Sequence, residues 1–141
     1  RIAYSVANTF LGRMCISGDV TNLTDAQWDM IDKGMEFYRL IAPIIKNGQS
    51  FLYGQRNKSD RHPRGWQALI RMQENGNAFA LIHTFDGELP EQIEISLPKG
   101  CTSAIGRIYS DTEADIFAEN NTLYYKPDTN WKAVAVLLSL Q

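Results

Sequence analysis

The hydrophobic pattern of the chain changes its period once, and this change limits the fold more than any other feature. Up to about residue 47, apolar side chains recur at intervals of three and four, as on one face of a helix. From Trp66 onward, apolar and polar residues alternate in short runs separated by turn residues, as in antiparallel strands. The polar stretch 49–65 between them is predicted to be a linker. We therefore expect an α+β chain, with a helical part over residues 1–48 and an antiparallel β-sandwich over residues 66–141.

The strongest helix signal begins at Thr24. Thr24 with Gln27 three residues later forms a capping-box pattern, and Gly48 is a typical C-terminal signal. Gly34 is expected to weaken the middle of this helix, and Pro43 to kink or end it. The apolar stripe is broad enough to need packing partners on more than one side. Its members are Trp28, Ile31, Met35 and Tyr38, widened by Met30, Phe37, Ile41 and Ile44.

A shorter helix and a strand are predicted before it. The run "RIAYSVANTF" can place Ile2, Val6 and Phe10 on one helical face. The apolar segment 13–17 that follows reads as a short buried strand, and it ends in a Ser-Gly-Asp corner that contains Asp19. The first 48 residues are therefore predicted to form a helix, a strand and a second helix.

The second half carries the signals of a sandwich. Asn75 and Gly76 form a dipeptide that favours tight hairpins between two alternating runs. Further short runs follow at regular spacing, with turn residues between them, which is typical of an antiparallel sandwich. The predicted strands lie within 66–73, 78–86, 91–98, 103–110, 114–119, 121–127 and 131–140.

Composition excludes several classes of function. With 44% hydrophobic residues the chain can bury a real core, and a net charge of −2 favours neither nucleic acid nor an anionic membrane as partner. No apolar run reaches the length of about 20 residues that a membrane span requires. The two cysteines, Cys15 and Cys101, cannot build a Cys-x-x-Cys metal site, and we expect both to be buried free thiols.

Residues that could carry chemistry are few. The only two histidines are His62, in the linker, and His83, which we expect to be a half-buried strand residue rather than a base. No phosphate-binding glycine motif and no nucleophile elbow is present. Most carboxylates fall in turns or on the polar helix face. Asp19 is the one carboxylate that follows a predicted strand and precedes a capped helix, and as a residue on its own it is predicted to be a polar cap of that turn.

The order of these features resembles one group of enzymes. The run "ANTFLGRMCISGDVTNLTDAQWDMIDKGMEFY" is similar to the end of the catalytic barrel in α-galactosidases and α-N-acetylgalactosaminidases, glycoside hydrolase families 27 and 36. In that group the last barrel strand is followed by a Ser-x-Asp or Ser-Gly-Asp corner and then by a final helix that begins with Leu-Thr or Leu-Ser. The matching positions here are Ser17, Gly18, Asp19, Leu23 and Thr24. The later stretch "GWQALIRMQENGNAFALIHTFDG" is similar to the β domain that follows the barrel.

The resemblance implies that the chain is the C-terminal part of a larger enzyme. Residues 1–48 would be the last helix-strand-helix of a (β/α)₈ barrel, and the missing catalytic barrel would be their partner. Such enzymes are retaining hydrolases that use two aspartates and no metal or organic cofactor, and both aspartates lie on earlier strands. We therefore expect no catalytic residue and no turnover in this chain alone. Ser17 and Asp19 are expected to lie at the rim of the sugar site, so that carbohydrate is a partner only through the parent enzyme.

Two further hypotheses belong to other functional classes. The sandwich could be a stand-alone carbohydrate-binding module with a helical extension, or a purely structural domain that supports the barrel and subunit association. Because the helix stripe would lack its barrel neighbours, we expect it to fold back on the sandwich or to form a homodimer with a second copy. The aromatic side chains of a sugar platform would come from Trp66, Tyr124, Tyr125 and Trp131, although we expect each of them to pack in the core or within a strand.

Overall fold

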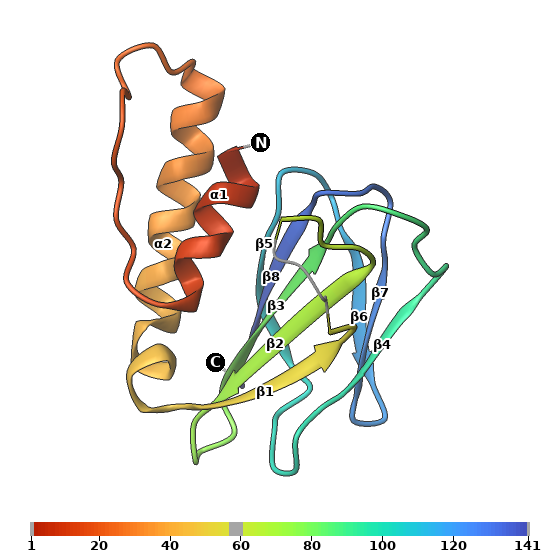
Figure 1. Cartoon of the computed structure of the whole chain (residues 1–141). Coiled ribbons are helices and arrows are strands. Elements are labelled where there is room, and N and C mark those ends of the chain that lie inside the picture. The colour runs from red at the N-terminus through yellow and green to blue at the C-terminus, as the bar shows by residue number, and fades with distance from the viewer. Residues whose placement is uncertain (1, 57–60, 141) are drawn as a thin grey trace.

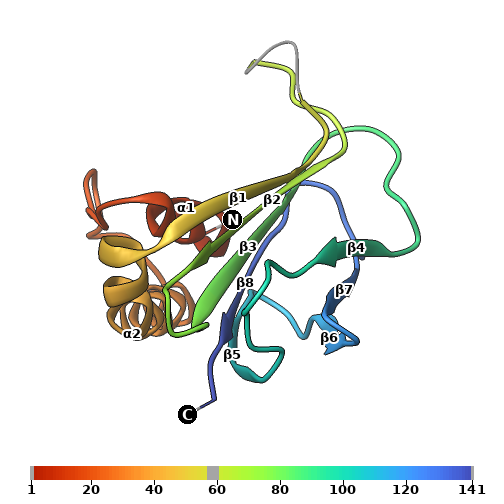
Figure 2. The same ribbon diagram turned by 90° about the horizontal axis from the view of Figure 1, so that it is seen from below.

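A computed structural model of the chain describes residues 2–56 and 61–140, and it forms three layers (Figures 1 and 2). A pair of helices covers one face of a large sheet, and a small sheet covers the other face. The helices are α1 (Ile2–Asn8), continued by the 3₁₀ turn η1 (Thr9–Leu11), and α2 (Asp25–Asn47). The strands are β1 (Gln49–Gly54), β2 (Trp66–Met72), β3 (Ala78–Thr84), β4 (Ile93–Ser96), β5 (Ile105–Tyr109), β6 (Asp115–Glu119), β7 (Thr122–Lys126) and β8 (Ala133–Leu138).

The strands form an antiparallel sandwich, as the alternating pattern predicts. The large sheet has the order β1-β2-β3-β8-β5 and the small sheet the order β4-β7-β6. All pairs of neighbouring strands run antiparallel. The Asn75-Gly76 turn joins β2 to β3, and Gly76 has a φ of 88°, which an L side chain rarely adopts. The predicted α+β class is confirmed, as are the seven strands predicted from residue 66 onward.

The two central strands of the large sheet are buried on both faces. All residues of β3 and β8 are buried. Along β3, Phe79 and Leu81 pack against the helices, whereas Ala80 and Ile82 pack against the small sheet, because successive side chains of a strand point to opposite faces. The molecule therefore has two apolar cores that share one sheet.

Helix α2 begins and ends as predicted. The hydroxyl of Thr24 accepts the backbone N–H of Gln27 at 3.2 Å, and the Gln27 side chain accepts the Thr24 N–H at 2.8 Å, which completes the capping box. The N–H of Gly48 donates to the carbonyl of Ile44 at the other end. Pro43 lies inside the helix, which continues for one more turn to Asn47.

The buried face of α2 differs from the predicted stripe. Trp28 is partly exposed and Tyr38 is only half-buried, while the buried line runs through Ile31, Gly34, Phe37, Ile41 and Ile44. The buried face is thus turned toward Gly34 relative to the predicted stripe. The reason is that α1 packs against this glycine, where any side chain would collide with Val6 of α1. The helices therefore approach each other at the glycine, and α2 folds back on the sandwich as expected.

The predicted strand 13–17 is wrong. This segment and the residues up to Thr24 form an irregular connection that runs alongside α2, away from the large sheet (Figure 1). A strand needs a paired neighbour, and no strand among residues 2–56 and 61–140 pairs with it. Ile16 is 48% exposed, and only Met14 packs against the helical core.

The first part of the predicted linker 49–65 is also wrong. Gln49–Gly54 forms the edge strand β1, which pairs along its whole length with β2. An edge strand exposes much of its surface, so β1 carries only the short apolar run Phe51-Leu52-Tyr53, in which Leu52 is 79% exposed, between polar residues and a glycine. Residues 57–60 of that segment lie outside the described residues.

Helix α1 is held to the large sheet through His83 of β3. Its Nε2 lies 2.6 Å from Oδ1 of Asn8 at the end of α1. The ring of Tyr4 meets the imidazole edge to face at 5.3 Å between centroids, and Phe85 stacks on its other side. His83 is only 9% exposed, so this contact is part of the buried core.

Candidate functional site

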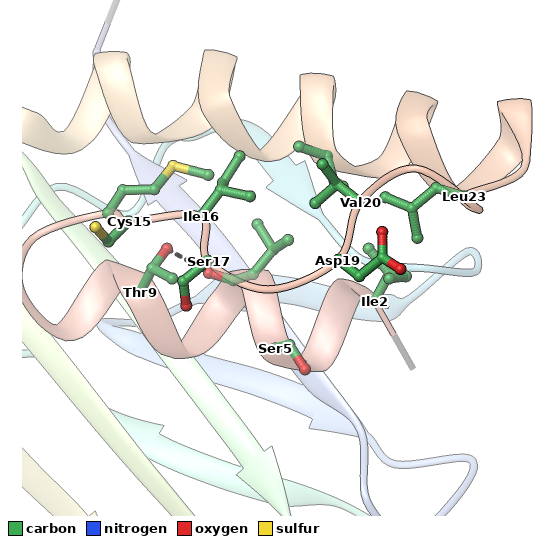
Figure 3. A pocket seen from close by; sticks show the side chains of 12 residues that line it. Ile2, Ser5, Thr9, Cys15, Ile16, Ser17, Asp19, Val20 and Leu23 are labelled. Carbon is green, nitrogen blue, oxygen red and sulfur yellow. Dashed lines mark hydrogen bonds between the residues drawn. The ribbon is translucent and has the colours of Figure 1, made fainter.

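Ser17 and Asp19 line the same cavity. It lies between α1 and the connection from η1 to α2, and its volume is about 340 Å³ (Figure 3). The apolar part of its lining comes from α1, α2 and the connection, including Val6, Leu23 and Ile31. The polar lining groups are Ser5, Thr9, Ser17 and Asp19. The structure thus brings the two predicted site residues together at one cavity, although the strand predicted to carry them is absent.

The Ser-Gly-Asp corner is a bend in the connection. Gly18 has a φ of 100°, a conformation in which any other residue would be strained, and it bends the chain between Ser17 and Asp19. Asp19 Oδ1 accepts two hydrogen bonds from Thr21, one from the backbone N–H at 2.9 Å and one from the hydroxyl at 2.6 Å. The carboxylate therefore caps the turn, as the residue alone predicts.

These hydrogen bonds also favour the ionised form of the Asp19 carboxyl group. The hydroxyl of Thr21 and then its backbone N–H lower the pKa of the carboxyl below its ordinary value, because both stabilise the ionised form. A carboxylate held in this form accepts hydrogen bonds from ligand hydroxyls but is a poor general acid near neutral pH. Asp19 is also the only carboxylate that lines this cavity in the described part of the chain. A retaining pair of carboxylates is therefore not assembled there.

The thiols differ from the prediction that both are buried. Cys15 is exposed at the cavity, because the connection that carries it does not enter a sheet. Cys101 is half-buried, and burial raises the pKa of its thiol to about 11, so that it stays protonated near neutral pH. Both cysteines are free.

Within the described residues, neither a metal-ligating cluster nor a membrane-spanning helix is found. Among residues 2–56 and 61–140, no group of three or more histidine, cysteine, aspartate or glutamate side chains is placed to hold a metal ion. His83 packs in the core as a structural residue, and His62 is exposed. No helix in the same ranges combines the length and the apolar character needed to cross a bilayer.

Most aromatic residues predicted for a sugar platform are packed within the protein. Tyr125 is buried between the sheets, and Trp131 contacts the rings of Tyr4 and Phe85. Trp66 packs partly against the core between the sheets. Tyr124 alone points to the outer face of the small sheet, where it stacks on Phe117.

Sequence reasoning missed Phe117, although one signal could have found it. Asn120 and Asn121 both have a positive φ and form the two-residue turn of the β6–β7 hairpin, which fixes the pairing of the strands around it. This register places Phe117 directly opposite Tyr124. It also puts Phe117 on the face opposite to Ile116 and Ala118, which pack inward.

The chain was compared with protein-family models, curated proteins and solved structures. No protein-family model matches the sequence, and no curated protein matches it. Among solved structures, the chain is similar to an alpha-amylase from H.orenii, with a TM-score of 0.47 and 12% sequence identity. The similarity covers 80% of this chain and 20% of the amylase, so this chain spans about a fifth of that protein's length. A TM-score of this size does not establish a common family.

Proposed function

We propose that this chain is the C-terminal part of a glycoside hydrolase that resembles the α-galactosidases. In this proposal, segment 13–17 is irregular in this chain and pairs as the last strand of a catalytic barrel only in the parent enzyme, where α1 and α2 are the helices on either side of it. The parent enzyme removes terminal α-galactosyl or α-N-acetylgalactosaminyl groups. The chain alone has no turnover, because the catalytic aspartates lie on the rest of the barrel.

The observation that carries this proposal is the state of segment 13–17. It runs beside α2 without a strand partner among the described residues, and it exposes Cys15 and Ile16 to solvent. Exposed apolar side chains of this kind are normally covered in a folded protein. A chain order of helix, extended segment and helix matches one repeat of a (β/α)₈ barrel. A neighbouring barrel strand would supply the missing pairing.

The position of Ser17 and Asp19 supports a role in sugar binding. Ser17 ends segment 13–17 and Asp19 follows it, and barrel enzymes build their sites at the C-terminal ends of their strands. The ionised carboxylate of Asp19 is exposed and keeps room for further hydrogen bonds beyond the two from Thr21. Its proposed task is to accept hydroxyl groups of the sugar at the rim of the site.

Hydrogen exchange tests the placement of the strand. We expect the backbone amides of residues 13–17 to exchange rapidly in the 141-residue chain and to become protected in the complete gene product, because barrel strands are paired on both sides. The amides of β3 serve as the internal control, since they are protected in both proteins. Rapid exchange of residues 13–17 in the complete gene product contradicts the proposal.

Enzyme assays test the proposed activity. A chromogenic α-galactoside should be hydrolysed by the complete gene product and not by the 141-residue chain. In the complete enzyme, Asp19→Asn should raise KM more than it lowers kcat, since a rim residue binds the sugar without moving a proton. Asp32→Asn is the matched control, because Asp32 is an exposed carboxylate on α2 that does not line the cavity. Release of the chromophore by the 141-residue chain above the buffer rate would show that the catalytic pair is present in it.

A further inference from the structure

Strand β1 forms an open edge of the large sheet (Figure 1). It pairs with β2 on one side, and no strand among residues 2–56 and 61–140 pairs with it on the other. Along an antiparallel strand, the backbone N–H and C=O groups of successive residues are directed alternately to the two sides. The outer side of β1 therefore presents a row of backbone donors and acceptors on which a further strand can pair.

The other three edge strands of the described chain carry charges that oppose such pairing. At the far edge of the large sheet, β5 has an irregular register between Ile105 and Arg107, and the Arg107 side chain is half exposed. In the small sheet, β4 carries Glu94, and β6 carries an acidic residue at each end. Charges and bulges are usual means by which proteins block edge-to-edge pairing. Strand β1 has neither a charge nor a register shift, and its six residues make it the longest of the four.

The middle of this edge is apolar and exposed. Leu52 is 79% exposed, although Leu69, directly opposite it on β2, packs against the helical core. Opposite residues of an antiparallel pair point to the same face, so Leu52 lies on the helix-covered face of the sheet but beyond the part that the helices cover. Phe51 and Tyr53 point to the other face, and both are half-buried. The helices therefore leave the sheet open beside Leu52.

We propose that β1 pairs antiparallel with β1 of a second copy of this chain, so that the two large sheets join into one. A two-fold axis at Leu52 places this residue opposite its own copy and Phe51 opposite Tyr53 on both sides of the axis. The aromatic pairs then share one face of the joined sheet, and the two leucines share the other. The same register sets Arg56 opposite Gly48, so no charge meets a like charge. Two identical charged strands would repel each other, whereas β1 is compatible with itself.

Sedimentation equilibrium of the 141-residue chain tests the pairing. A contact of one strand on each side is small, so we expect the weight-average mass to rise from that of a monomer toward that of a dimer between about 10 µM and about 1 mM. Hydrogen exchange at the two ends of this range should show that the β1 amides facing away from β2 become protected in the dimer alone. The amides of β3 are the internal control, because this strand is buried and paired on both sides in the monomer.

Charge substitutions at Leu52 then test the register. Leu52→Lys and Leu52→Glu each place two like charges opposite each other in the dimer, so each should weaken dimerisation about tenfold or more. An equimolar mixture of the two variants brings opposite charges together and should restore dimerisation. Leu40→Lys is the matched control, because Leu40 is a leucine of α2 that is 45% exposed, and this variant should associate like the unaltered chain. Since Leu52 is largely exposed, its variants should fold, and an unchanged urea midpoint confirms this.

Three results would overturn the proposal. One is a monomer mass over the whole concentration range. Another is association that persists in Leu52→Lys and is lost in Leu40→Lys, which would place the contact on the helices. The third is a mixture of Leu52→Lys and Leu52→Glu that stays monomeric, since Leu52 would then not meet its own copy. The pairing lies on the sandwich, so none of these results bears on the exchange of residues 13–17, which tests the proposed barrel separately.

Discussion

Protonation of His83 is expected to destabilise the fold between about pH 6.5 and pH 4. The imidazole is buried between α1 and the large sheet, and burial lowers its pKa from 6.5 to about 4. The rings of Tyr4 and Phe85 contact the imidazole, and within residues 2–56 and 61–140 its hydrogen-bond partner is Oδ1 of Asn8. No carboxylate is among these contacts, so the charged form of the ring has no compensating partner.

The direction and the size of this stability change follow from the pKa of His83 in the unfolded chain and in the folded chain. Above pH 6.5 the histidine is neutral in the folded and the unfolded chain, and its contribution to stability is complete. Below pH 6.5 the unfolded chain takes up a proton that the folded chain resists until about pH 4, so stability falls as the pH falls through this window. A difference of about 2.5 pKa units corresponds to roughly 3 kcal/mol of unfolding free energy.

Urea denaturation at a series of pH values between 7 and 4 measures this loss. The variant His83→Gln keeps a hydrogen-bond donor but cannot be protonated. Its unfolding free energy should therefore fall much less between pH 6.5 and pH 4 than that of the unaltered chain. His62→Gln is the matched control, because His62 is exposed, and it should behave as the unaltered chain. Carboxylates that titrate near pH 4 contribute equally to all three proteins and cancel in the differences. If His83→Gln and the unaltered chain lose the same stability between pH 6.5 and 4, the reasoning is wrong.

Three further changes test the packing, each by urea denaturation against the unaltered chain. Gly34→Ala improves helix propensity, yet its methyl group collides with the stiff side chain of Val6, so we expect a net loss of about 1–3 kcal/mol; a gain in stability would contradict the close helix contact. Lys132→Met removes an ammonium that is 3% exposed and bonds to both oxygens of Asp128, at 3.0 and 3.1 Å, so a loss of about 1–3 kcal/mol is expected; an unchanged midpoint would show that the pair adds nothing. Thr24→Ala removes the N-cap of α2 and should cost about 1 kcal/mol, whereas a change below a few tenths would mean that the capping box is not formed.

The local signals in the sequence predicted most of the fold. The Thr24 capping box, the Asn75-Gly76 turn and the alternating runs depend on neighbours within a few residues, so they are readable without the tertiary structure. The edge strand β1 was missed, because a strand that exposes one face and one edge has no clear apolar pattern. The rotation of α2 was missed for a different reason, since the docking of α1 at Gly34 decides which side is buried.

The candidate site was predictable only in part. Ser17 and Asp19 were found from a local pattern, and they do line one cavity. The opposite wall, however, is formed by α1, and no local signal predicts how that helix packs. Segment 13–17 has the composition of a strand but lacks a partner in the described chain, because a strand is defined by its neighbour and not by its own residues.

The burial of β3 and β8 on both faces has a consequence for how this chain can be inherited or engineered. Removing the helices would expose a continuous apolar surface that includes Phe79, Leu81 and Leu137, and such a sheet would aggregate. Gene recombination at the junction between α2 and β1 would therefore separate two parts that share one apolar core, and each part would expose its half of that core. The helical pair and the sandwich must travel together as one heritable unit, and a graft of the sandwich alone needs polar replacements across the face that the helices now cover.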